Sequence, residues 1–187
     1  MEMVLILAVL FAALGIIWPS INAYQRQQLL REAAEFTQVR LTAARFHAVE
    51  TGLTYQFRFE REGRHFVVIP YEPDDSQSAN SGAPGSVSAP GTIWKCAGEL
   101  AETIEFHEVS AASQGSLQVT AVGLSGLPDS SDLLAVSWSA PLLFFPDGSA
   151  SGGLIEVADK SGQRLQITVR ELTGGVTVTE VESKKTP

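Results

Sequence analysis

The sequence predicts an α+β protein in which one long N-terminal helix packs on an antiparallel head of two β-sheets. Residues 3–18 are uncharged and apolar, and small and aliphatic residues then recur at helical spacing. From residue 53 apolar and polar residues alternate, which is typical of half-buried strands. We therefore expect a transmembrane helical part at 1–21, an amphipathic helical part at 22–51 and a globular β-rich head at 52–187.

The apolar run predicts the membrane half of the helix. Such a segment leaves water for lipid, where each backbone amide must find its partner within the segment, and so it forms a helix. Its sixteen residues span about 24 Å at ~1.5 Å per residue, which is short of a ~30 Å hydrocarbon core. We expect a few apolar residues upstream of Glu2, so that the sequence starts late. A cleaved signal peptide is the alternative, but no basic start or small-x-small cleavage site is present.

The amphipathic half carries one stripe of small and aliphatic side chains at steps of four and three. The stripe consists of Leu30, Ala34, Thr37, Leu41, Ala44 and Ala48. This spacing places them on one face of the helix, which we expect to pack against the head. Thr51-Gly52 should end the helix, because glycine is favoured just after a helix C-terminus. An anchor followed by an independent helix is the alternative.

The head is predicted from alternating patterns and turn residues. Residues 53–69 predict a hairpin with one aromatic face formed by Tyr55, Phe57 and Phe59. Residues 70–91 are rich in Ser, Ala, Gly and Pro and predict a flexible loop. Short strands are expected at 92–94, 103–106, 117–122 and 133–138, followed by an antiparallel meander with strands at 142–145, 154–157, 165–169 and 176–181.

Charge and residue spacing argue against nucleic-acid binding and catalysis. Residues 71–187 hold six Lys or Arg against fifteen Asp or Glu, a net charge of −9 that repels phosphate backbones. The single Cys96 excludes an internal disulfide, and the three histidines lack the spacing of metal ligands. We expect no catalytic residue, cofactor or metal. A membrane-tethered enzyme that uses Cys96 and His107 is kept as an alternative.

An acidic residue and a proline bracket the apolar run. Glu2 precedes it, and Pro19 follows seventeen positions later. This pattern resembles the N-terminal segment of type IV pilins and type II secretion pseudopilins, whose mature chains open Phe-Thr-Leu-x-Glu after a basic leader. The resemblance implies leader cleavage with N-terminal methylation, a helix kink at Pro19, and a Glu2 that pairs with the terminal amine of a neighbouring subunit. Alternatively, Glu2 is simply a solvated terminal residue.

The C-terminal quarter carries a second pattern, in which an apolar strand leads into a Pro-Asp-Gly turn, a Gly-Gly-led strand and a last strand after Thr-Gly. Its turn residues are Pro146, Asp147, Gly148, Gly152, Gly153 and Gly174. The pattern resembles the H-type minor pseudopilins (GspH) and the related FimT-like pilins. No Lys-Ser/Thr follows, as it would in a phosphate-binding loop.

The two resemblances imply a pilin-like, non-enzymatic subunit near the tip of a type II secretion pseudopilus, taking part in filament initiation and protein secretion. The implied partners are other minor and major pseudopilins, the inner-membrane assembly platform and secreted proteins. The implied location is the bacterial inner membrane, crossed once, with the head in the periplasm. The alternative is a FimT-like minor type IV pilin involved in pilus assembly or DNA uptake.

Overall fold

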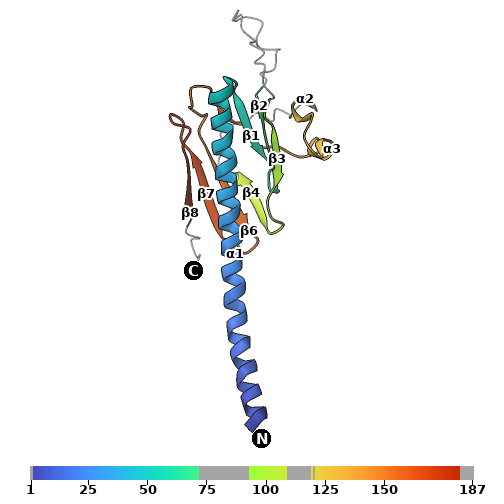
Figure 1. The fold of residues 1–187 in the computed structure, drawn as a ribbon, viewed down its shortest axis with the longest axis vertical. Helices are drawn as coiled ribbons and strands as arrows, with labels where there is room; N and C mark the ends of the chain where they lie inside the picture. The colour runs from blue at the N-terminus through green and yellow to red at the C-terminus, as the bar shows by residue number, and fades with distance from the viewer. Residues whose placement is uncertain (1, 72–92, 109–118, 120, 182–187) are drawn as a thin grey trace, which may run out of the picture.

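The computed structural model describes residues 2–71, 93–108, 119 and 121–181, and the side chains of the first helix from Tyr24 onward. Helix α1 runs without interruption from Glu2 to Thr51. Its C-terminal half lies along the head, and its N-terminal half extends beyond it (Figure 1). After α1, Gly52 adopts a φ of +70° and donates its N–H to the carbonyl oxygen of Ala48 at 3.0 Å. Glycine reaches this left-handed conformation without a Cβ clash, and so the helix stops here.

Two four-stranded antiparallel sheets form the head. The first has the order β3-β2-β1-β5 and consists of β1 (Tyr55–Phe59), β2 (His65–Pro70), β3 (Cys96–Glu99) and β5 (Leu142–Phe144). The second has the order β4-β6-β7-β8 and consists of β4 (Ile104–Glu108), β6 (Gly153–Asp159), β7 (Arg164–Val169) and β8 (Val176–Val181). The predicted α+β class, a long helix packed on two antiparallel sheets, is confirmed.

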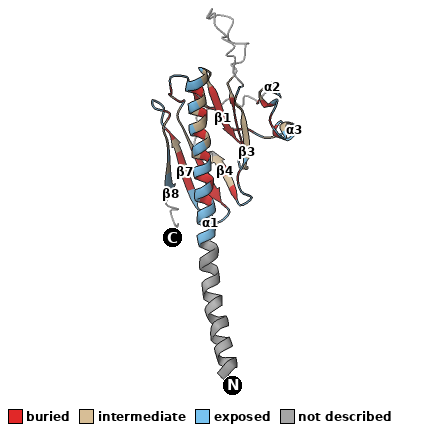
Figure 2. Cartoon of the chain, in the orientation of Figure 1, coloured by how far each residue is buried: buried red, intermediate tan, exposed pale blue. Residues whose placement is uncertain are grey.

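The main core lies between α1 and the two sheets. The helix turns its buried residues toward the sheets and its exposed residues outward (Figure 2). The first sheet contributes an aromatic cluster in which the rings of Phe57 and Phe66 stack at 5.8 Å and those of Phe59 and Phe106 lie 5.2 Å apart. Phe106 comes from β4 of the second sheet, so the two sheets share one core.

The hairpin β1–β2 is buried on both faces, and this extends the predicted single aromatic face. All five residues of β1 are buried, including Gln56 and Arg58. A second cluster covers the outer face of the sheet, where Val67 and Ile69 pack with Leu124 and other apolar residues of the segment 119–138. This segment contains two short helices, α2 (Ala121–Leu124) and α3 (Ser130–Leu133).

Several predicted strands are wrong. The described part of 117–122 contains no strand, because Ala121–Leu124 forms α2. The segment 133–138, predicted as a strand, contains the last residue of α3 and then a turn. Its β pairing is limited to an isolated bridge between Trp138 and Glu60. The described residues of 92–94 form no strand, and the strand starts later, at Cys96.

The C-terminal meander is correct for three of its four strands. β6, β7 and β8 pair in sequence order, but β5 pairs with β1 of the other sheet. Phe57 of β1 lies opposite Leu142 on one side and Val68 on the other. In the predicted flexible loop 70–91, Pro70 closes β2 and Tyr71 donates its N–H to the carbonyl oxygen of Thr54. The remaining positions lie outside the described residues.

Candidate assembly surface

The inner face of α1 attaches the helix to the head. All six residues of the predicted stripe are buried: Leu30, Ala34, Thr37, Leu41, Ala44 and Ala48. The helix contacts strands of both sheets. Small side chains at three of these positions allow the backbone to approach the sheets closely, and Thr37 satisfies its hydroxyl by donating to the carbonyl oxygen of Ala33 at 2.8 Å. The helix and head therefore form one packed unit.

Three polar contacts flank this packing, each between a helix side chain and the second half of the head. Arg45 donates through Nε to the carbonyl oxygen of Gly148 at 3.0 Å. Gln38 donates through Nε2 to the carbonyl oxygen of Val176 at 3.1 Å. Arg31 pairs with Glu180 at 3.1 Å. These contacts connect the helix to β8 and to the turn between β5 and β6.

The predicted turn residues lie where the helix ends. In the Pro146–Ser149 turn, Asp147 accepts hydrogen bonds from the backbone N–H and the hydroxyl of Ser149 at 2.9 and 2.6 Å. Gly174 has a φ of +56°, and a Cβ there would lie 2.6 Å from the carbonyl oxygen of Gly148. Only glycine fits this close approach of two turns. Gly152 and Gly153 lie at the start of β6.

The outward face of α1 carries a second apolar stripe, which we call the outer seam: Phe36, Val39, Ala43 and Phe46, of which Ala43 is half-buried and the others are exposed. Its steps of three, four and three are those of the seam along which two helices pack. Val39 and Phe46 are each 62% exposed, and Glu32 and Glu50 flank the seam along the helix. Exposed apolar side chains grouped in this way mark interaction surfaces. Phe36 meets the head, because its ring lies 5.7 Å from that of Phe66, and Arg40 stacks over the Phe36 ring at 4.8 Å. Val39 and Phe46 stay accessible to a partner helix.

The groups with perturbed pKa values lie in the head, away from the outer seam. Partial burial raises the pKa of Glu60, but hydrogen bonds from the His65 ring and from the backbone N–H groups of His65 and Arg64 outweigh it and lower the pKa overall. The hydrogen bonds from Ser149 lower the pKa of Asp147. Burial lowers the pKa of Arg58, whose Nε donates to Gln56 at 2.8 Å. Glu60 and Asp147 each hold a turn in place.

Glu2 and Pro19 lie in α1, but their side chains fall outside the described part of the structure. Their proposed roles in subunit pairing and helix kinking therefore stay predictions. Within the described residues, no helix combines the length and the apolar character needed to cross a membrane.

The residues considered for catalysis are spread over α1 and the head. Cys96 lies on β3 of the first sheet and His107 on β4 of the second. His47 pairs with Glu50 at 3.3 Å and stacks on Trp94, while His65 bonds Glu60. Among the described residues, no three His, Cys, Asp or Glu side chains group as metal ligands.

The outer seam is not among the features predicted above, although the sequence carries a signal for it. Phe36, Val39, Ala43 and Phe46 repeat at helical spacing, offset from the buried stripe on the same helix. The contacts of Arg31, Gln38 and Arg45 depend on which strand and which turn of the head reach the helix, and no local pattern encodes that.

Comparisons with known proteins give matches only at the level of structure. No family model matches the chain, and no curated protein matches it significantly. Two solved structures of the minor pseudopilin EpsH from the type II secretion system of Vibrio cholerae are similar to it. One is 14% identical, covering 80% of this chain and 95% of that chain with a TM-score of 0.45. The other is 13% identical and covers 84% of this chain and 98% of that chain, with a TM-score of 0.47. Likenesses this distant do not assign an activity.

Proposed function

We propose that this chain is a non-catalytic filament subunit of the minor pseudopilin type, which takes part in filament initiation and protein secretion. The observation that carries the proposal is the outer seam. A helix whose inner face is buried against its own head exposes a second apolar stripe at the spacing of helix–helix packing. In the monomer Val39 and Phe46 stay mostly exposed, whereas a helix-packed assembly would bury them.

The rest of the proposal concerns the membrane anchor, the location of the head and the pairing of Glu2, and it is supported by the sequence. In the proposal, the N-terminal apolar segment anchors the chain in the bacterial inner membrane, and the head lies in the periplasm. Glu2 then pairs with a neighbouring subunit, because a carboxylate at the edge of an apolar layer is costly when unpaired. The partners are major and minor pseudopilins, with the assembly platform and secreted proteins as further contacts. The net charge of −9 on residues 71–187 disfavours the DNA-uptake alternative.

The outer seam can be tested by placing a charge in it. Fully burying a large apolar side chain contributes about 1.5–3 kcal/mol. The Phe46→Glu variant loses this contribution and places a carboxylate in the contact, so its helices should not pack together. We expect the full chain in mild detergent to sediment as oligomers and the Phe46→Glu variant to sediment as monomers. Leu134→Glu is the matched control, because Leu134 is also exposed, at 51%, but lies just after α3.

Both variants should keep the thermal unfolding midpoint of the parent chain, since both positions are exposed. Equal oligomerisation of Phe46→Glu and the parent chain would exclude the outer seam as the assembly surface. A parent chain that stays monomeric at all concentrations would contradict the filament proposal itself.

A further inference from the structure

One apolar side chain projects from the end of the head. Leu172 is 92% exposed, the largest value among the large hydrophobic side chains described as exposed. It lies in the turn between β7 and β8, which is held rigidly. Arg170 donates its N–H to the carbonyl oxygen of Gly175 at 2.9 Å, Gly174 donates to that of Arg170 at 2.9 Å, and Ala150 donates to that of Glu171 at 2.8 Å. The turn therefore presents Leu172 from a fixed backbone.

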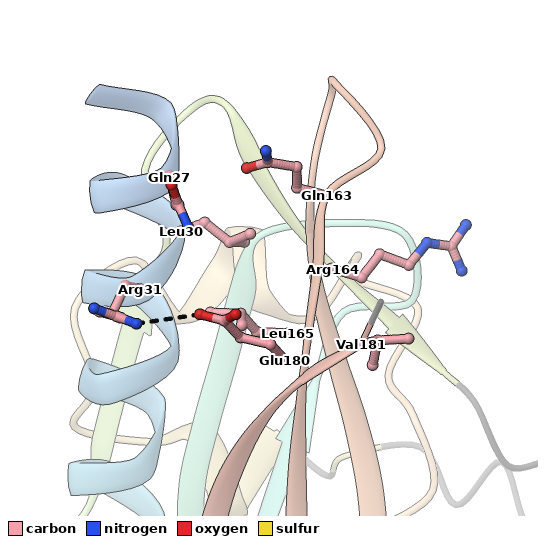
Figure 3. A pocket seen from close by; sticks show the side chains of 8 residues that line it. All are labelled: Gln27, Leu30, Arg31, Gln163, Arg164, Leu165, Glu180 and Val181. Atoms are coloured by element: carbon pink, nitrogen blue, oxygen red, sulfur yellow. Dashed lines mark hydrogen bonds and ion pairs between the residues drawn. The ribbon is translucent and has the colours of Figure 1, made fainter. Parts of the chain in front are cut away.

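A groove lies between α1 and the other end of the same hairpin (Figure 3). Its apolar lining comes from Leu30, Leu165 and Val181, and Arg31 and Glu180 pair across it at 3.1 Å. Gln27, Gln163 and Arg164 complete the lining. The volume is about 210 Å³. An apolar cavity of about 150 Å³ holds benzene, so this groove has room for a leucine side chain.

The turn and the groove cannot meet within one molecule. In the β7–β8 pairing, Val169 lies opposite Val176 next to the turn, while Leu165 lies opposite Glu180 next to the groove. The two features are therefore at opposite ends of the hairpin. α1 runs alongside, contacting both strands.

The charges of the turn that carries Leu172 and of the groove are complementary. The exposed residues beside Leu172 are Arg170 and Glu171. The groove offers the carboxylate of Glu180 to Arg170 and the guanidinium group of Arg31 to Glu171; Arg164 pairs with Glu156 at 3.2 Å instead. The Arg31–Glu180 pair is more than half exposed on both sides, so breaking it to admit the turn costs little.

We propose that the turn carrying Leu172 in one copy of this chain docks in the groove of a second copy, head to tail. The two surfaces are different patches of the same molecule, and so the contact is heterologous and repeats without closing. Heads joined in this way form a row along the direction of α1. The inference rests on the proposed filament function and adds to it a contact between heads that is separate from the outer seam.

Disulfide trapping tests the contact on the full chain in mild detergent, in a Cys96→Ser background. Thr173→Cys leaves Leu172 in place, and Gln163→Cys marks the groove. A chain with both substitutions should give a ladder of dimers, trimers and longer species on oxidation. A mixture of the two single variants should stop at dimers, because each chain then carries one half of the contact. Adding Leu172→Ser to the double variant should abolish the ladder.

The control pairs Gln163→Cys with Ser131→Cys, an exposed position in α3. A ladder no stronger than this control, a ladder that survives Leu172→Ser, or dimers formed by Thr173→Cys alone would each overturn the head-to-tail contact. Sedimentation separates this failure from that of the proposed function. If the chain oligomerises through Phe46 but gives no ladder, only the head-to-tail contact is wrong. If the chain neither oligomerises nor gives a ladder, the filament proposal fails as well.

Discussion

Truncating Leu41 to alanine should loosen the helix from the head. Leu41 is 0% exposed and belongs to the core shared by α1 and both sheets. Leu→Ala changes in cores cost about 2–5 kcal/mol, depending on how far the surroundings collapse into the cavity. Here collapse is restricted, because Arg45 and Gln38 hold the helix to the carbonyl oxygens of Gly148 and Val176 in the head at 3.0 and 3.1 Å. We therefore expect a loss of about 3–4 kcal/mol.

Thermal unfolding of the full chain in mild detergent, followed by tryptophan fluorescence, measures this loss. A domain of this size loses about 2–4 °C of Tm per kcal/mol, so the midpoint should fall by about 10 °C. Val39→Ala is the matched control, two residues away on the exposed outer seam, and should cost less than about 0.5 kcal/mol. Equal midpoints for the two variants would refute the assignment of inner and outer helix faces.

Three further predictions concern the turns and the N-terminus. Gly174→Ala should destabilise the head by about 1–3 kcal/mol in the same assay, and by more than Gly162→Ala, whose added Cβ meets open space; equal losses would contradict a steric role. The folded-state pKa of Glu60 is lowered, so its contribution to stability is present above the ordinary pKa of 4.5 and is lost as the pH falls through the folded value. Glu60→Gln should therefore flatten the acid limb of Tm against pH, and an unchanged limb would exclude this contribution. Glu2→Ala should leave membrane insertion intact but abolish filament incorporation, which crosslinking to neighbouring subunits measures; normal crosslinking would exclude the pairing role of Glu2.

Much of the helix could be predicted from the sequence, because its packing is periodic and local. The buried stripe from Leu30 to Ala48 repeats every three or four residues, and this spacing indicates one buried face of a helix. Gly52 then marks the stop. The strands near the C-terminus are similarly regular, with Leu165, Ile167 and Val169 alternating and all buried in β7.

The middle of the chain could not be predicted in the same way. α2 and α3 are each four residues long, which is about one helical turn and too short for a period to appear. Leu133 and Trp138 are buried because they cover β2, not because they form a strand. The outer-face burial of Val67 and Ile69 on β2 has the same origin, since their apolar neighbours there come from the later segment 119–138.

The assignment of β5 also depends on tertiary structure. Leu142 and Phe144 are apolar enough for a buried strand, but their sequence does not specify which sheet they join. The structure places β5 beside β1, with Tyr55 opposite Phe144. The Pro146–Ser149 turn and Gly153 then lead the chain into the second sheet. The connection from β5 to β6 therefore passes from the first sheet to the second near the end of α1.

The measurement that tests the central claim most directly is the proximity of α1 helices in the assembled chain. A nitroxide label on Val39→Cys, in a Cys96→Ser background, reports this through spin–spin broadening. Packed helices lie about 8–10 Å apart, so the account predicts strong broadening that disappears when labelled chains are diluted with unlabelled ones. A label at Leu134→Cys should show none. A spectrum at position 39 that is as narrow as the one at position 134 would contradict assembly through the outer seam.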